Sequence, residues 1–262
     1  MRLPGIGGVF FWPGGSLWIG TTTVVSERHS HHAIQLAIGI SGPVQFRSDA
    51  DAHWQTYDAA LIPSRFFHSF QAPRVRLANI LFDPQSIAGR SAAKLVSAGR
   101  IRRMQAAETR LWADRLGRAF SDGAGDEEMQ SLAQRAVADI CCTEVPDRPT
   151  DPRILRAIDF IYGRLDEPLT LGQVAETVHL SEGRLRHLFV QETGTGFRPF
   201  VLWARLNRAV ELGFSSGNWT DAAHSAGFAD SAHLSRTCRS MFGFAPSSMR
   251  QRNGSRPAEV SG

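Results

Sequence analysis

The chain has 262 residues, with 29 basic and 25 acidic side chains and a formal net charge of +4. This length allows two domains with separate cores, and a charge balance this even does not by itself indicate nucleic-acid binding. No apolar run is long enough to span a membrane, and no signal peptide is recognisable. We therefore expect a cytoplasmic protein, whose three cysteines suit a reducing compartment.

Residues 5–85 carry short runs of alternating apolar and polar side chains, separated by Gly, Pro, Asp and Ser. This pattern predicts many short β-strands and no long helix, which is typical of a small barrel or a double-sheet sandwich. The expected strands are Leu17–Val25, Ala33–Ile40, Val44–Arg47, Ala59–Pro63 and Val75–Phe82.

Residues 86–143 change to a helical composition rich in Ala, Arg, Leu and Gln. Their apolar spacing predicts two helices, Ser86–Phe120 and Asp126–Cys142, which form a packing or dimerisation segment. Residues 144–152 hold several prolines and cannot continue a helix, so we expect a linker there.

A histidine-rich stretch raises the question of a ligand or metal. His29 and His31 lie on one face of an extended segment, and Gln35 and His68 follow. The spacing resembles the cupin metal pattern, although a neutral amide stands where a carboxylate is usual. Three readings remain open: a metal held by His29, His31 and His68, an effector contacted by all four residues, or structural histidines. We expect effector contact, with no metal and no cofactor.

Residues 170–194 contain two short helix patterns joined by a tight turn. Thr170 and Gln173 form a capping-box pattern before the first helix. Ser181 can cap the second helix, and Gly194 is placed to end it. Because the second helix has a basic outer face, the stretch predicts a helix-turn-helix.

The same pattern then returns. Asn218, Asp230 and Gly243 take the equivalent cap and terminating positions, and Phe197–Phe214 carries one apolar stripe that predicts a bridging helix. A tandem helix-turn-helix is less easily produced by chance than a single one.

Residues 168–250 resemble the DNA-binding domain of the AraC/XylS family of bacterial transcription regulators. The shared motifs are Leu180-Ser181, Arg184–Phe189, Arg205–Ala209, Gly227-Phe228, Leu234–Arg236 and Phe242–Arg250. The sequence departs from the family at Trp219, Ala222, Leu234 and Cys238, which predicts a smaller core in the second unit. The resemblance implies an α+β chain, with a cupin-like barrel and helices followed by an all-α DNA-binding domain over 153–252 and a disordered tail over 253–262.

The resemblance also implies which positions reach DNA. The expected base-reading positions are Glu182, Gly183, Arg186 and His187 in the first unit, and Ser231, Ala232, Ser235 and Arg236 in the second. Arg186 and Arg236 are the strong readers, because a guanidinium can pair with guanine through two hydrogen bonds. Arg239, Arg198, Arg205 and Arg250 are better placed for phosphates or internal salt bridges.

These observations predict a sequence-specific transcription regulator that binds double-stranded promoter DNA and is controlled by a small molecule in the N-terminal barrel. The resemblance implies a homodimer, with RNA polymerase as a candidate partner. No nucleophile stands beside the histidines, so we do not expect an enzyme. Two alternatives remain: a metal-binding cupin enzyme fused to a DNA-binding module, and an inert barrel used only for dimerisation.

Overall fold

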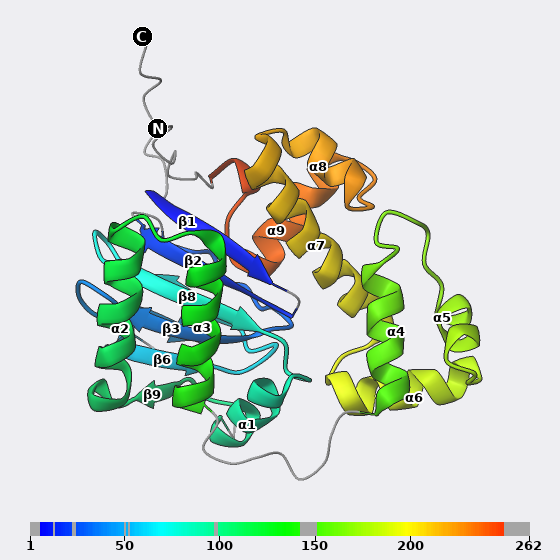
Figure 1. Ribbon diagram of the computed structural model, residues 1–262, viewed down its shortest axis with the longest axis horizontal. Helices are drawn as coiled ribbons and strands as arrows, with labels where there is room; N and C mark the ends of the chain where they lie inside the picture. Colours follow the sequence, from blue (N-terminus) through cyan, green and yellow to red (C-terminus); the bar gives the residue numbers. More distant parts are fainter. Residues whose placement is uncertain are drawn as a thin grey trace.

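The computed structural model describes residues 6–12, 14–22, 25–49, 51, 53–96, 99–141 and 151–248. The described part of the chain has β-sheets and helices in its N-terminal portion and helices alone in its C-terminal portion, which is an α+β fold (Figure 1). Most of the expected linker over 144–152 and all of the expected tail over 253–262 lie outside the described residues. None of the described helices is both long and apolar enough to cross a membrane.

Two antiparallel sheets form the N-terminal portion. The larger has the strand order β1-β2-β8-β3-β6-β9, and the smaller has the order β5-β4-β7. The strands are β1 (Ile6–Trp12), β2 (Gly15–Thr21), β3 (Ile34–Gly39), β4 (Val44–Ser48), β5 (Gln55–Tyr57), β6 (Ala59–Ile62), β7 (His68–Gln71), β8 (Arg76–Phe82) and β9 (Arg102–Met104). All five expected strands are present, and the described residues form the double-sheet alternative. A cupin-like barrel stays a prediction.

The central strand β3 is buried on both of its faces. Because side chains alternate along a strand, Ile34, Leu36 and Ile38 point to one side, where they join the core beneath the helices. Ala37 points to the other side and joins the core shared with the smaller sheet. Gln35 lies two residues before Ala37, so its side chain points to the same face of β3, toward the smaller sheet.

Helices α1 (Ile87–Leu95), α2 (Ala106–Ser121) and α3 (Asp126–Cys141) lie along the larger sheet (Figure 1). The expected single helix over Ser86–Phe120 was wrong, because it is two helices separated by β9. β9 pairs with β6 in antiparallel fashion, with Ala59 opposite Met104. Gly99, at φ +60°, lies between α1 and β9 and has a backbone conformation that favours glycine. The larger sheet therefore extends past residue 85.

The C-terminal portion consists of two helical units that share one long helix. The helices are α4 (Pro152–Tyr162), α5 (Leu171–Thr177), α6 (Glu182–Thr193), α7 (Phe197–Ser216), α8 (Trp219–Ser225) and α9 (Ser231–Phe242). Phe200 and Ala204 of α7 belong to the core of the first unit. Leu206 and Val210 of the same helix belong to the core of the second unit.

The predicted helix caps are confirmed. Thr170 and Gln173 make both hydrogen bonds of a capping box at the start of α5. The side chains of Ser181 and Asp230 accept hydrogen bonds from the backbone at the starts of α6 and α9. Both helices end at a left-handed glycine, Gly194 or Gly243. These local signals fix where the two candidate recognition helices begin and end.

The second unit accommodates its unusual residues without losing its core. Ala222, Leu234 and Cys238 are almost fully buried. The ring of Trp219 lies directly over Gly213 of α7, where a Cβ atom would collide with it. The indole therefore occupies space that the glycine leaves open.

The two portions of the chain are packed against each other. Trp18 of β2 contacts Phe214, Phe242 and Phe244, with ring centroids 6.2, 5.1 and 6.5 Å away. Ala33 and Leu81 of the N-terminal portion lie in the same buried cluster as the second helical unit. The second unit therefore shares its core with the sheet.

Candidate functional site

The first candidate recognition helix, α6, presents its predicted DNA-reading side chains to solvent. Glu182, Gly183, Arg186 and His187 are all exposed. The opposite side of the helix carries the buried residues Leu185, Leu188 and Phe189. A helix whose polar face is free while its apolar face is anchored is suited to insertion in a groove.

The second candidate recognition helix, α9, has the same division. Ala232, Arg236 and Arg239 are exposed, while Ser231 and Ser235 are half-buried. Its buried side holds Leu234, Cys238 and Phe242. Two arginines of α9 are therefore exposed to solvent, although the last turn of this helix packs against the N-terminal portion.

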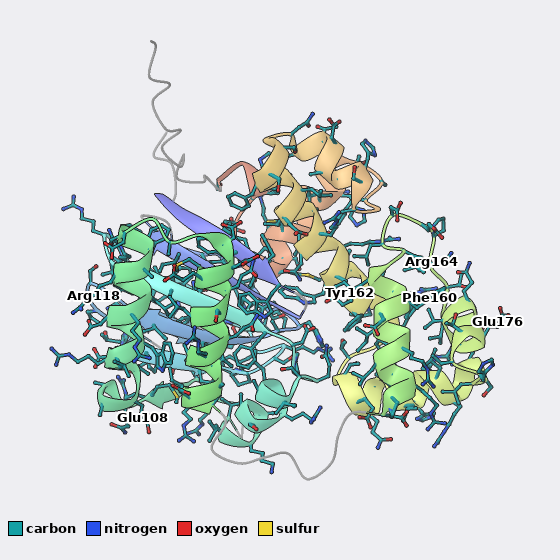
Figure 2. All side chains as sticks on the ribbon, viewed as in Figure 1. Glu108, Arg118, Phe160, Tyr162, Arg164 and Glu176 are labelled. Atoms are coloured by element: carbon teal, nitrogen blue, oxygen red, sulfur yellow. The ribbon has the colours of Figure 1, made fainter. Side chains whose placement is uncertain are left out.

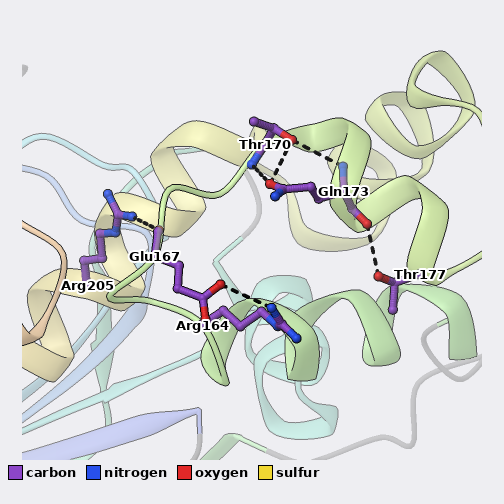
Figure 3. Close-up of polar contacts among 6 residues, drawn as sticks. All are labelled: Arg164, Glu167, Thr170, Gln173, Thr177 and Arg205. Carbon is purple, nitrogen blue, oxygen red and sulfur yellow. Dashed lines mark hydrogen bonds and ion pairs between the residues drawn. The ribbon is translucent and has the colours of Figure 1, made fainter.

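One of the candidate phosphate-binding arginines has a structural position instead. Arg205 donates a hydrogen bond to the carbonyl oxygen of Glu167 at 2.7 Å (Figure 3). It also donates to the carbonyl oxygen of Leu165 at 2.8 Å. It ties α7 to the loop between α4 and α5. Arg198 is exposed, and Arg250 lies outside the described residues.

The four residues predicted around the histidine-rich stretch lie together. His29, His31 and His68 are almost fully buried, and their ring centroids are 4.3 to 5.9 Å apart. Nε2 of His31 lies 3.0 Å from Oε1 of Gln35, whose amide nitrogen donates to Asn79. Asn79 was not predicted from the sequence, because it lies on β8 and nothing in the residues around it indicates this contact.

Burial keeps the three histidines uncharged. Desolvation, together with the positive charge that His31 would carry, lowers the pKa of His29 to about 4, against a hydrogen bond to the Glu27 carbonyl that raises it. Desolvation also lowers the pKa of His31, and it holds the pKa of His68 well below its ordinary value. Each ring is therefore a neutral imidazole at physiological pH, with one nitrogen that can accept a hydrogen bond or bind a metal.

Two cavities lie near these residues, and they differ greatly in size. The one bordered by His29, His31 and Gln35 has a volume of about 50 Å³. The other is a cleft of about 670 Å³ between the N-terminal portion and helices α4 and α7. Organic ligands usually occupy pockets of about 300–1,000 Å³, so only the cleft is large enough for a metabolite.

The cleft combines aromatic walls with acidic groups. Its aromatic lining residues are Phe11, Trp12, Phe82, Tyr162 and Trp203, and its acidic ones are Asp83, Asp159, Asp166 and Glu211. Tyr162 is on α4 (Figure 2). Burial raises the pKa of Asp83 to about 7, against hydrogen bonds from Gln85 and Trp203 that lower it. This cleft was not predicted from the sequence, because its walls come from both portions of the chain.

Comparison with protein families identifies a helix-turn-helix domain over residues 174–252. An HTH-type transcriptional regulator of Escherichia coli, YidL, is 31% identical over 124 residues, which cover 46% of this chain and 42% of YidL. The chain thus matches less than half the length of this curated relative.

Two solved structures extend the comparison. A transcriptional regulator from Chromobacterium violaceum, described by its AraC-type DNA-binding domain, is 31% identical over 36% of this chain and 86% of its own, with a TM-score of 0.35. ToxT from Vibrio cholerae covers 89% of this chain and 95% of its own at 12% identity, with a TM-score of 0.53, so it shares the fold. One ToxT structure holds (E)-4-(8-methylnaphthalen-1-yl)but-3-enoic acid.

Proposed function

Since this chain belongs to the AraC-type family of helix-turn-helix transcription regulators, we propose that it is a ligand-controlled, sequence-specific regulator that binds promoter DNA through α6 and α9. The main support for this proposal is the construction of the two helices. Both are capped at each end, packed on the core through an apolar face, and exposed on the opposite face, which contains arginine. Regulation, rather than an enzymatic reaction, is its role.

DNA selection from the source genome tests this function directly. The full-length protein is expected to enrich a discrete set of fragments, with an affinity that falls steeply as salt rises. An Arg186→Ala, Arg236→Ala double variant should lose that enrichment. Arg118→Ala is the matched control, because Arg118 is an exposed arginine of α2, far from both recognition helices (Figure 2). Enrichment that survives in the double variant would refute the assignment of α6 and α9.

The organic effector binds in the interdomain cleft. The acidic lining of the cleft, with Arg208 as a basic group already paired to Glu211 at 2.9 Å, favours an aromatic ligand with a positively charged or hydrogen-bond-donating group. A carboxylic acid such as the ToxT ligand would face carboxylates here. A ligand that contacts both walls stabilises the docked arrangement of the two portions, which is how binding can alter DNA engagement.

A thermal-shift comparison separates these ligand chemistries. Naphthylmethylamine is expected to raise the Tm of the full-length protein, while naphthylacetic acid, which has the same ring system, is not. An Asp159→Asn, Asp166→Asn variant should lose the response to the amine. Stabilisation by the acid alone would contradict the proposed effector class.

The regulator acts in the cytoplasm as a homodimer, with RNA polymerase as a partner at the promoter. Most of the apolar residues of α2 and α3 that we expected at a dimer interface pack against the larger sheet instead, as Leu116 and Ile140 do. Leu111 of α2 is 53% exposed. α2 is therefore the surface at which a second copy pairs. Light scattering of the wild type and of Leu111→Arg tests this, and a wild-type monomer at micromolar concentration would exclude it.

A further inference from the structure

The three clustered histidines are all oriented by the same kind of hydrogen bond. Nδ1 of His29, His31 and His68 lies 2.8, 2.8 and 2.9 Å from the backbone carbonyl oxygens of Glu27, Ala33 and Phe66, respectively. A carbonyl can only accept, so Nδ1 carries the hydrogen atom in His29 and His68, and Nε2 of these two rings is left with a lone pair. Both ring nitrogens of His31 lie beside acceptors, the carbonyl of Ala33 and Oε1 of Gln35.

The three rings lie close together in a buried space. One ligand nitrogen from each ring lies within 4.8 Å of the other two. Nε2 of His68 is buried and has no hydrogen-bond partner among the described residues. A buried acceptor without a donor destabilises the folded protein. A cation bound by all three rings would satisfy the lone pair of His68 and would use one nitrogen each of His29 and His31.

We propose that His29, His31 and His68 bind one divalent transition-metal ion of the zinc type, and that this ion fixes the histidine loop, residues 25–32, against the end of α9. Imidazole nitrogens are preferred ligands of Zn²⁺ and other late first-row transition-metal ions, whereas Mg²⁺ and Ca²⁺ prefer oxygen ligands. Hydrogen bonds from the other ring nitrogen to backbone carbonyls are the usual way in which such histidines are oriented. Metal–nitrogen distances in such a site are about 2.0 Å.

The amide of Gln35 completes the site on its fourth side. Its Oε1 atom already faces Nε2 of His31 at 3.0 Å, and Asn79 holds the rest of the amide in place. A neutral fourth ligand or a water molecule suits a site that has no carboxylate. The adjoining cavity of about 50 Å³ is large enough for an ion with a water molecule and too small for an organic effector.

The ion site is joined to the second recognition helix through the histidine loop. Glu27 donates its backbone N–H to the carbonyl of Gly243 at 3.0 Å, and Ser30 donates to the carbonyl of Ser240 at 3.4 Å. A Cβ atom on Gly243 would lie only 2.7 Å from Nδ1 of His29. The loop therefore packs against the last turn of α9, and a metal that ties His29 and His31 to His68 of β7 makes this contact rigid.

Metal uptake by tag-free, chelator-treated full-length protein tests the site. We expect one Zn²⁺ or Co²⁺ ion per chain, with micromolar or tighter affinity, and a rise in Tm on loading. His29→Ala combined with His68→Ala should abolish uptake. His53→Ala, at an exposed histidine outside the cluster, is the matched control and should leave uptake unchanged. Absence of binding by the wild type, or equal loss in the control, would overturn the proposal.

Because the double variant can fail to fold, a second measurement uses only the wild type. X-ray absorption of the zinc-loaded protein should show nitrogen and oxygen neighbours at about 2.0 Å with imidazole scattering. Sulfur neighbours at about 2.3 Å would place the ion at a cysteine and refute the assignment.

Hydrogen exchange tests the connection to α9. Zn²⁺ should slow exchange in both residues 25–32 and 238–244, while α6 remains unchanged. Slower exchange in the N-terminal segments alone would refute the coupling to α9. Neither measurement uses DNA, so the result is independent of the proposed function.

Discussion

At the scale of single residues, two exposed arginines should affect DNA binding in different ways. Arg186 lies in the N-terminal half of α6, whereas Arg239 lies in the last turn of α9. We expect Arg186→Ala to cost about 1–3 kcal/mol at the preferred site and to blur base preference. Arg239→Ala should weaken binding to all sequences and reduce the slope of log affinity against log salt by about 1.

Competition binding at several salt concentrations measures both effects on the same DNA fragments. Arg118→Ala again provides the background for removing a surface arginine. Equal losses in the two helix variants, with base preference unchanged in both, would contradict the division between base and phosphate contacts.

The buried carboxyl group of Asp83 predicts a pH dependence of stability. Its pKa rises from 3.8 to about 7, chiefly because of desolvation, so the folded protein binds more protons than the unfolded chain between these values. The free energy of unfolding should therefore fall by about 3–4 kcal/mol through this group as pH rises from 4 to 7.

Asp83→Asn, which keeps the size of the side chain, should remove this contribution. The Tm difference between wild type and variant, followed from pH 5 to pH 8, isolates Asp83 from the buried histidines, whose effect has the opposite sign. A difference that does not vary with pH would show that Asp83 stays ionised in the folded protein.

At the scale of elements, the caps were the most predictable part of the fold. Ser181, Asp230, Gly194 and Gly243 lie where local sequence predicts them, because capping needs only one side chain and its own backbone. β9 was missed because Arg102–Met104 has no apolar alternation, and its strand conformation depends on pairing with β6. Short edge strands of this kind are set by distant partners.

The capping box of α5 can be tested within the helix. Thr170→Ala removes the hydroxyl that accepts from the Gln173 N–H, and it should destabilise α5 by about 1 kcal/mol (Figure 3). Amide exchange in α5 should then become roughly fivefold faster. Thr177→Ala is the matched control, because Thr177 lies on the same helix and only donates to the carbonyl of Gln173. An equal effect of the two changes would assign the loss to the threonine methyl group.

At the scale of the whole molecule, a site could be predicted from the sequence only where its residues lie close together along the chain or follow a known family pattern. His29, His31 and Gln35 could be grouped because they share one short segment, and His68 could be added through the resemblance to cupins. The cleft could not be predicted, because Asp83, Tyr162 and Trp203 come together only when the two portions pack. Local pattern contains no information about that packing.

Operator spacing follows from the bridging helix. α7 has 20 residues and is therefore about 30 Å long, close to the ~34 Å repeat of B-form DNA. With α6 packed near its beginning and α9 along its second half, simultaneous reading by both helices depends on the rotational phase of their half-sites. Inserting about 5 base pairs between the half-sites turns one of them to the far side of the duplex, and affinity should drop to that of a single unit. Inserting about 10 base pairs restores the phase but exceeds the reach of α7, so affinity should stay low, and we expect the operator to be constrained in both the spacing and the phase of its half-sites.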